Sequence, residues 1–192
     1  MRRIHVTGNS SSGKSTFAAA LAEAIGGEFV ELDALNWLPD WVGLNATDPE
    51  RLIGRFADAT CGEAWVAAGS YMTFAQRAFW SRLDTVIYLD LPMPLLVWRV
   101  LRRSWQRWRT GELLWGTNVE SFWKQLAVWR GEESLVWWIV TQHARKQRRF
   151  FDQVADPKWA HIRFIRLKSK REIGAFLARV QAGAANLPSA SS

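Results

Sequence analysis

The segment Gly8–Ser15, with the sequence GNSSSGKS, holds residues whose types and spacing allow chemistry on phosphates. It matches the pattern GxxxxGK[ST], in which glycines let backbone N–H groups turn towards a phosphate. An apolar run, Arg3–Thr7, precedes it, and a helical pattern, Thr16–Ile25, follows it. The N-terminus of that helix adds unpaired N–H donors and partial positive charge. We therefore expect this loop to hold the phosphates of ATP or a related nucleotide.

Two side chains of the loop are suited to phosphoryl transfer. Lys14 is long enough to reach the β- and γ-phosphates, so we predict that it is catalytic, and the hydroxyl of Ser15 can bind Mg²⁺. The alternative is a glycine- and serine-rich turn with a chance lysine, and the flanking strand and helix argue against it. The predicted nucleotide-binding residues are Gly8, Asn9, Ser10, Ser11, Ser12, Gly13, Lys14, Ser15 and Thr16.

Asp33 stands at the end of a second predicted strand, Glu28–Leu32. A carboxylate at that height of the sheet can accept a proton from a substrate hydroxyl or hold a magnesium-bound water. We therefore predict that Asp33 is catalytic and, with Ser15, a metal ligand. A helix cap or a loop hydrogen bond is the alternative. Glu31 alternates with Asp33 along the strand and would share its face, but it ranks below Asp33.

The elements that must position these residues alternate between strands and helices, which predicts an α/β fold with helices on both faces of a parallel sheet. His5 lies inside the first strand and is expected to be a packed core residue. No linker divides the chain, so residues 1–182 are predicted to form one domain, with 183–192 as a flexible tail. Five strands are expected, at Arg3–Thr7, Glu28–Leu32, Trp65–Ala68, Thr85–Leu89 and Ile162–Leu167.

The composition limits the class of partner. The 192 residues carry a formal charge of +7, which fits nucleic acid, an anionic membrane surface or small polyanions. Nucleic acid is possible but not favoured, because arginines near a phosphate-binding loop already have phosphates to bind. The longest apolar run, Leu135–Val140, is too short to cross a bilayer, so no membrane partner is expected. The single cysteine, Cys61, and the lack of a targeting pattern predict a cytoplasmic location.

In this order the motifs resemble those of adenylate-kinase-like P-loop kinases, and among them the bacterial topology modulation proteins, or adenylate-kinase-related kinases. The resemblance covers nearly the whole chain. It implies a P-loop NTPase three-layer sandwich with a helical lid, and ATP and Mg²⁺ as cofactors. Besides the phosphate loop it rests on Ile4–Gly8, Glu31–Trp37, Trp65–Val66 with Gly69 and Tyr71, Asp84–Pro92, Trp98–Arg103, and Ser134–Leu135 with Trp137–Trp138.

The resemblance also divides the domain into regions. Residues 34–64 would bind the acceptor, and Trp37 and Trp41 in that region could stack on a base or another planar group. Residues 103–145 would form the helical lid.

Two arginines follow the fourth predicted strand on a long basic helix. Arg99 and Arg103 are four residues apart, hence on one helical face. In adenylate-kinase-like enzymes, arginines at this place hold the nucleotide phosphates and offset charge on the transferring phosphoryl group. We therefore predict that both are catalytic and nucleotide-binding, a solvated basic face being the alternative. The later run Arg145–Arg149 is predicted to be a plain basic surface.

The chain departs from the resembled family at the end of the third strand, which usually reads Asp-Gly. Here it reads Ala68-Gly69, so the usual carboxylate of this strand is missing. The next position, usually Asn, is Ser70, and Arg77 is the nearest candidate for an arginine expected a few residues later. Mg²⁺ binding would then depend on Ser15, phosphate oxygens, water and Asp33.

These observations lead to three hypotheses. The first is an ATP-dependent kinase that transfers the γ-phosphoryl group to a small acceptor, such as a nucleotide or nucleoside. The second is a nucleotide-responsive regulatory or nucleic-acid-associated module with little or no turnover, which the missing carboxylate at position 68 and the charge of +7 favour. The third is a nucleotide-binding protein that hydrolyses its ligand slowly.

Overall fold

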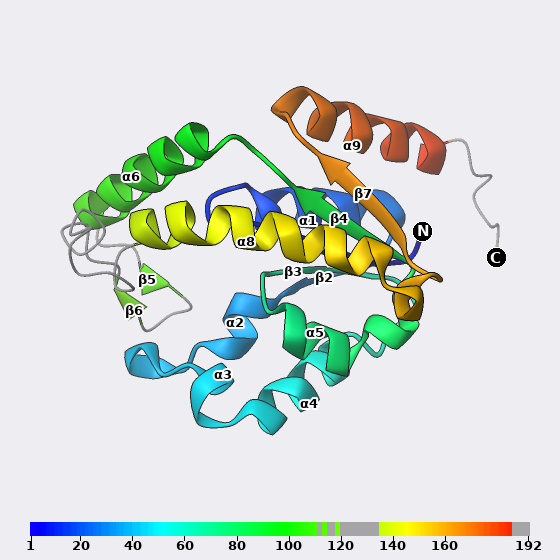
Figure 1. The fold of residues 1–192 in the computed structure, drawn as a ribbon, viewed down its shortest axis with the longest axis horizontal. Coiled ribbons are helices and arrows are strands. Elements are labelled where there is room, and N and C mark those ends of the chain that lie inside the picture. The colour runs from blue at the N-terminus through cyan, green and yellow to red at the C-terminus, as the bar shows by residue number, and fades with distance from the viewer. Residues whose placement is uncertain (111–112, 115–117, 120–134, 186–192) are drawn as a thin grey trace.

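The computed structural model describes residues 1–110, 113–114, 118–119 and 135–185. Its centre is a sheet of five parallel strands in the order β2-β3-β1-β4-β7 (Figure 1). The strands are β1 (Arg3–Gly8), β2 (Glu28–Glu31), β3 (Trp65–Ala68), β4 (Thr85–Leu89) and β7 (Arg163–Leu167). The predicted α/β class, a five-stranded parallel sheet between helices, is confirmed.

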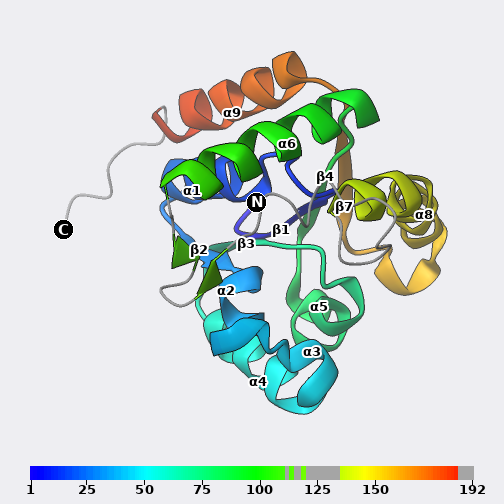
Figure 2. The same ribbon diagram turned by 90° about the vertical axis from the view of Figure 1, so that its left-hand side faces the viewer.

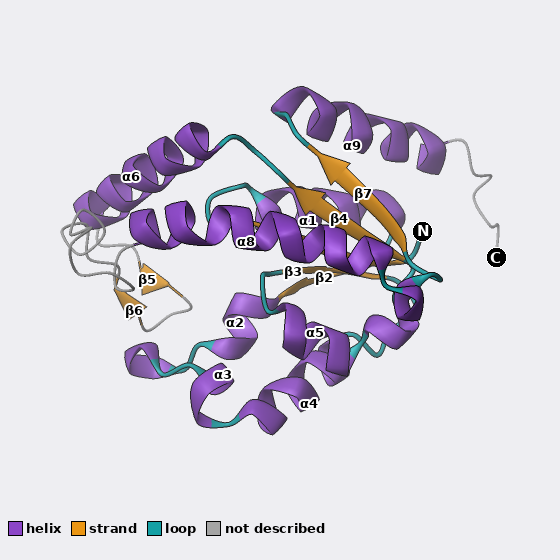
Figure 3. Ribbon diagram, viewed as in Figure 1, coloured by secondary structure: helices purple, strands orange, loops and turns teal. Residues whose placement is uncertain are grey.

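Helices cover both faces of this sheet and make a fold of three layers (Figures 2 and 3). One face carries α1 (Lys14–Ile25), α6 (Met93–Thr110) and α9 (Lys170–Ala185), and the other carries α4 (Pro49–Ala59), α5 (Met72–Ala78) and α8 (Leu135–Ala155). The shorter elements are α2 (Leu32–Asn36), η1 (Pro39–Trp41), α3 (Leu44–Thr47), η2 (Trp80–Arg82), η4 (Pro157–Trp159), and the antiparallel pair β5 (Leu113–Leu114) and β6 (Asn118–Val119). β6 contacts η1, so the β5–β6 pair lies beside the segment between α2 and α3.

Alternate residues of the strands pack into two separate cores. Along β3, Val66 and Ala68 pack with residues of α1 and α9, whereas Trp65 and Ala67 pack with residues of α4, α5 and α8. Strands that are buried on both faces have nearly continuous apolar sequences. This is why the central strands could be located from the sequence.

The second strand is shorter than predicted, and this changes the placement of Asp33. β2 ends at Glu31, and the chain turns into α2 at Leu32. Leu32 is fully buried in the core on the α4 side, which fixes this turn. Asp33 therefore lies in the first turn of α2, where the partial positive charge of a helix N-terminus favours a carboxylate. The prediction that Asp33 ends a strand and shares a face with Glu31 is wrong.

The predicted lid and tail lie only partly within the described residues. Residues 103–110 and 135–145 of the lid belong to α6 and α8, and the described remainder is the β5–β6 pair. α9 continues to Ala185, so the first three residues of the predicted tail 183–192 are helical, as their alanines favour. Residues 186–192 lie outside the described part of the chain. Among the described helices, none combines the length and apolarity needed to span a membrane.

His5 links β1 to the end of β3 through a buried polar network. Trp80 Nε1 donates a hydrogen bond to His5 Nδ1 at 3.2 Å, so the ring carries its proton on Nε2. That Nε2 lies 3.2 Å from the carbonyl oxygen of Gly69 and donates to it. Burial lowers the pKa of His5 to about 4. His5 is therefore a neutral core residue, as the sequence predicted.

We expect the protein to lose stability as the pH falls from about 6.5 to about 4 because of His5. The unfolded chain protonates this residue at its ordinary pKa of 6.5, whereas the folded chain does so only near pH 4. Each pH unit corresponds to about 1.4 kcal/mol, so the loss approaches about 3 kcal/mol. The free energy of unfolding, measured with urea at several pH values in this window, should depend less steeply on pH for His5→Gln than for the wild type. Equal slopes would contradict the assignment.

Candidate nucleotide-binding site

The loop between β1 and α1 has a backbone shape that depends on its glycines. Gly8 has a φ of 150°, and a Cβ placed on it would lie 2.7 Å from the carbonyl oxygen of Leu89 in β4. Gly13 has a φ of 90° and is the N-cap of α1. L side chains disfavour both conformations. Because α1 begins at Lys14, the unpaired N–H groups of its first turn are part of the loop.

Lys14 lies over this loop with its side chain half-buried. Its Nζ donates a hydrogen bond to the carbonyl oxygen of Asn9 at 3.0 Å. Burial lowers the pKa of Lys14 below its usual value, and Arg103 acts in the same direction, whereas Asp33 and Glu31 oppose them. A bound anion would offset the cost of burying this charge.

Two hydroxyl groups of the loop also fit an anionic ligand. The Oγ atoms of Ser11 and Ser12 are buried, and neither has a hydrogen-bond partner among the residues that the structure describes. Leaving a buried polar group unpaired costs about 1–3 kcal/mol. Phosphate oxygens accept hydrogen bonds from hydroxyls, so these side chains fit the polyphosphate that the sequence predicts.

Arg99 reaches the same loop from α6. Its Nη1 donates to the carbonyl oxygens of Ser11 and Ser12, each at 3.2 Å. Arg103, one turn further along α6, is close enough to lower the pKa of Lys14. The structure therefore brings together the two arginines and the lysine that the sequence singled out.

A fourth cation, Lys146 of α8, joins this group, and the prediction that Arg145–Arg149 is a plain basic surface is wrong at this residue. Lys146 Nζ donates to Asn9 Oδ1 at 3.4 Å. Burial lowers the pKa of Lys146 to about 7, and the Lys14 ammonium acts in the same direction. The Asp33 carboxylate opposes the shift, so its charge also acts on Lys146.

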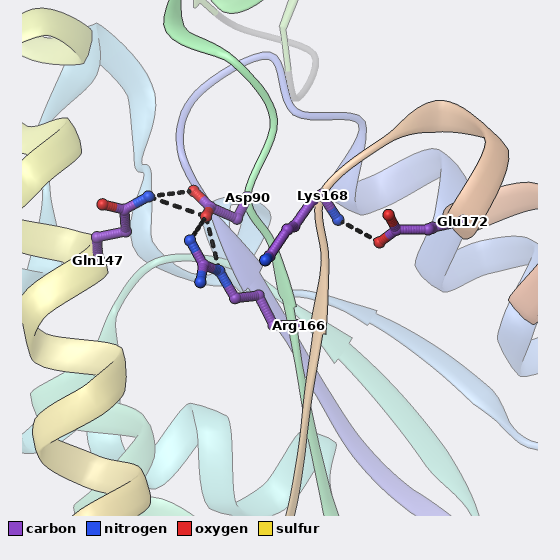
Figure 4. A network of polar contacts seen from close by, with 5 residues as sticks. All are labelled: Asp90, Gln147, Arg166, Lys168 and Glu172. Atoms are coloured by element: carbon purple, nitrogen blue, oxygen red, sulfur yellow. Dashed lines mark hydrogen bonds and ion pairs between the residues drawn. The ribbon is translucent and has the colours of Figure 1, made fainter.

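The carboxylate of Asp90 connects α8 to the sheet through Gln147 and forms an ion pair with Arg166 of β7, as Figure 4 shows. Asp90 follows β4 directly, and its side chain is only 4% exposed. The carboxylate accepts hydrogen bonds from Gln147 Nε2 at 2.9 and 3.1 Å and from Arg166 Nε at 2.8 Å. Gln147 is the neighbour of Lys146 in α8, so these contacts anchor the helical turn that carries Lys146 to the loop.

Ser15 contacts Glu31, a residue that the sequence ranked below Asp33. Ser15 Oγ donates a hydrogen bond of 2.6 Å to Glu31 Oε1 at the end of β2. The predicted metal-binding hydroxyl is therefore already paired with a carboxylate.

Asp33 faces a different neighbour, the phenol of Tyr71. Burial raises the pKa of Tyr71 above its usual range, and the Asp33 carboxylate acts in the same direction. The phenol therefore stays protonated and hydrogen-bonds to Asp33. Asp33 also acts electrostatically on Lys14 and Lys146. The charge of the Asp33 carboxylate is thus felt at Lys14 and Lys146, and a carboxylate in such surroundings could accept a proton from a hydroxyl.

The remaining predicted residues differ in their relation to the site. Arg77 Nη2 bonds to Glu50 Oε1 at 2.8 Å, and both side chains are more than half exposed, so Arg77 belongs to a surface ion pair. Ser70 Oγ donates to the carbonyl oxygen of Gly8 at 2.8 Å and so supports the loop. Trp37 and Trp41 meet edge to face, with ring centroids 5.5 Å apart.

We expect ATP binding at pH 8 to be coupled to proton uptake by Lys146. With a pKa of about 7 this side chain is mostly neutral at pH 8, and the negative charge of a bound triphosphate raises its pKa. ATP affinity should therefore fall as the pH rises above 7. Calorimetric titrations at pH 8 in two buffers of different ionisation enthalpy measure the protons taken up.

Lys146→Met should lower this proton uptake, and Lys158→Met, at an exposed lysine of η4, should leave it unchanged. Equal uptake by the wild type and Lys146→Met would remove Lys146 from the nucleotide site.

No protein-family model matches the chain. An uncharacterized Bacillus subtilis protein, YqaC, is 28% identical over 119 residues, which are 62% of this chain and 66% of YqaC, just under two thirds of its length.

Solved structures match over far more of the chain. A gluconokinase from Sinorhizobium meliloti has a TM-score of 0.51 at 20% identity, over 96% of this chain and 91% of its own. A sugar kinase from a Janibacter species has a TM-score of 0.55 at 16% identity, over 100% and 99%. The shikimate kinase of Acinetobacter baumannii has a TM-score of 0.53 at 19% identity, over 98% and 96%. The chain therefore has the fold of the P-loop kinases.

Proposed function

We propose that this protein is an ATP-dependent kinase that transfers the γ-phosphoryl group to a hydroxyl of a small acceptor, such as a nucleoside or nucleotide. One observation carries the proposal. Lys14, Arg99, Arg103 and Lys146, from three separate helices, converge on the phosphate loop, and Asp33 lies beside them. A site for tight nucleotide binding alone has no need of a carboxylate next to the transferring phosphate.

The residues divide into a donor side and an acceptor side. On the donor side, the loop amides and Lys14 bind the phosphates of ATP, and Arg99 and Arg103 offset the charge that spreads over the phosphoryl oxygens during transfer. When bound through Ser15, Mg²⁺ neutralises charge on the β- and γ-phosphates. On the acceptor side, Asp33 orients the attacking hydroxyl and accepts its proton.

Tyr71 supports the acceptor side. Its protonated phenol hydrogen-bonds to Asp33 and so fixes the direction of the carboxylate. Trp41, which is 39% exposed next to Trp37, offers a planar apolar surface in the region 34–64. Structural neighbours named for gluconate, a sugar and shikimate support an acceptor with a free hydroxyl.

The ordered similarity from Ile4 to Trp138 supports a relationship to the topology modulation proteins. The single free cysteine, Cys61, supports a cytoplasmic location. Both assignments are part of this proposal.

The test is a screen of nucleosides, nucleotides and small alcohols with ATP and Mg²⁺, in which ADP and the phosphorylated acceptor are both measured. The proposal expects at least one acceptor to be phosphorylated, with ADP formed in equal amount, and no product from Lys14→Ala. ADP formed at one rate with every acceptor and with none would favour slow hydrolysis. ATP binding with no ADP would favour the regulatory module.

A further inference from the structure

The carboxylate that is missing from β3 has a counterpart on the neighbouring strand. We propose that Glu31 takes the place of an acidic residue at position 68 and holds the Mg²⁺ side of the nucleotide site. This inference rests on the proposed use of ATP and Mg²⁺. It assigns to Glu31 the metal-side role that the sequence gave to Asp33.

The register of the sheet places Glu31 at the level of Ala68. The two residues are partners in the parallel ladder between β2 and β3, and laterally paired residues of neighbouring strands point to the same face of a sheet. Ala68 packs in the core that contains Phe17 and Ala18 of α1. Glu31 therefore points to the face where α1 begins, and Ser15 lies in the first turn of that helix.

Glu31 contacts the predicted metal-binding hydroxyl directly, because Ser15 Oγ donates a hydrogen bond of 2.6 Å to Glu31 Oε1. A serine that donates its proton to a carboxylate keeps its oxygen lone pairs for a cation. Carboxylates that hydrogen-bond to metal ligands orient those ligands and raise their basicity. Glu31 is thus in the position to prepare Ser15 for Mg²⁺ and to balance the charge of the ion.

The length of the side chain suits the change of strand. β2 is one strand further from β1 than β3 is, which adds about 4.8 Å across the sheet. Glutamate is one methylene longer than aspartate and recovers part of that distance. Glu31 also acts on the pKa of Lys14, raising it against the effect of burial, so its charge is felt at the phosphate loop.

The test compares the affinity for the imido analogue of ATP, which resists transfer, with Mg²⁺ present and with EDTA. Titration calorimetry of the wild type should show tighter binding with Mg²⁺. Glu31→Gln keeps the shape and the hydrogen-bond acceptor but removes the charge, and it should weaken binding about 10–100-fold with Mg²⁺ and little with EDTA. The matched control is Glu28→Gln, which removes a charge from the exposed start of the same strand and should keep the Mg²⁺ preference.

Four results would overturn the assignment. An unchanged Mg²⁺ preference in Glu31→Gln would remove Glu31 from the metal side. Equal weakening with Mg²⁺ and with EDTA would mean that Glu31 only stabilises the start of α1. A wild type that binds the analogue equally well in both conditions would leave no metal effect to assign. A wild type that does not bind it at all would overturn the proposed function as well.

A second variant tests the equivalence of the two positions. Adding Ala68→Asp to Glu31→Gln should restore the Mg²⁺ preference, because the carboxylate returns to the same face one strand closer to the loop. Binding of the analogue in EDTA reports that the double variant is folded. A double variant that binds in EDTA without regaining the preference would refute the exchange of positions.

Discussion

Replacement of Lys14 by alanine should abolish the stabilisation that ATP and Mg²⁺ give to the folded protein. A ligand that binds only the native state adds RT ln(1 + [L]/Kd) to the free energy of unfolding, about 2.7 kcal/mol at one hundred times Kd. For a chain of this size that corresponds to a rise in Tm of roughly 5–10 °C. Lys14 Nζ lies over the loop, 3.0 Å from the carbonyl oxygen of Asn9, where it would meet the phosphates. Thermal unfolding with and without millimolar ATP and Mg²⁺ measures the shift.

Lys14→Ala should itself fold, because it removes a cation that is half-buried beside Arg103 and Lys146. The matched control is Lys158→Ala, at an exposed lysine, which should keep the full shift. If the wild type showed no shift with any nucleoside triphosphate, the nucleotide site would be refuted.

The phosphate loop could be predicted from sequence because its function depends on local features. A strand, two glycines with positive φ, a lysine and a helix N-terminus all fall within a dozen residues. The three central strands, β3, β1 and β4, were also predictable, since a strand covered on both faces has a nearly continuous apolar sequence. The edge of the sheet was less so. β2 has exposed residues at its start and turns into α2 at Leu32, which no periodic pattern marks.

The inward-facing position of Lys146 could not be predicted from the local run of charged residues alone. The run of basic residues predicts a plain basic surface at Arg145–Arg149, but in α8 Arg145, Arg148 and Arg149 are exposed whereas Lys146 and Gln147 are partly buried. Phe150 is buried, and positions three and four residues before it share its face of the helix. Those positions are Lys146 and Gln147. The apolar residue Phe150 is therefore the sequence feature that indicates that they face inward.

The proposed role of Glu31 could not be predicted from the sequence, because it depends on the register of the sheet. Whether it lies level with Ala68 depends on how β2 and β3 pair, and two strands separated by more than thirty residues do not state their register in the sequence. Strand alternation predicts that Glu31 and Asp33 share one face, whereas in the structure Glu31 contacts Ser15 and Asp33 contacts Tyr71.

Arg99→Ala and Asp33→Asn should both reduce phosphoryl transfer far more than they weaken ATP binding, for different reasons. Arg99 is proposed to act on charge that develops during transfer, and loss of one such donor costs about 10²–10³ in kcat. Arg99 also bonds the carbonyl oxygens of Ser11 and Ser12, so a smaller loss of ATP affinity should accompany it. Asp33 is proposed to act on the acceptor as a general base, and loss of such a base lowers the rate of transfer by about 10²–10⁴. Turnover with the acceptor found by the screen, together with ATP affinity from calorimetry, separates the two effects.

The substitution of Asp33 by asparagine is informative because it preserves the surroundings of the carboxylate. Asparagine has nearly the same size and still accepts a hydrogen bond from Tyr71, so a loss of transfer would come from the missing charge and basicity. The acceptor KM should rise in Asp33→Asn and stay near the wild-type value in Arg99→Ala, since only Asp33 is proposed to orient the acceptor. Normal transfer by Asp33→Asn would remove Asp33 from the mechanism, and normal transfer by Arg99→Ala would leave the basic face of α6 without a catalytic role.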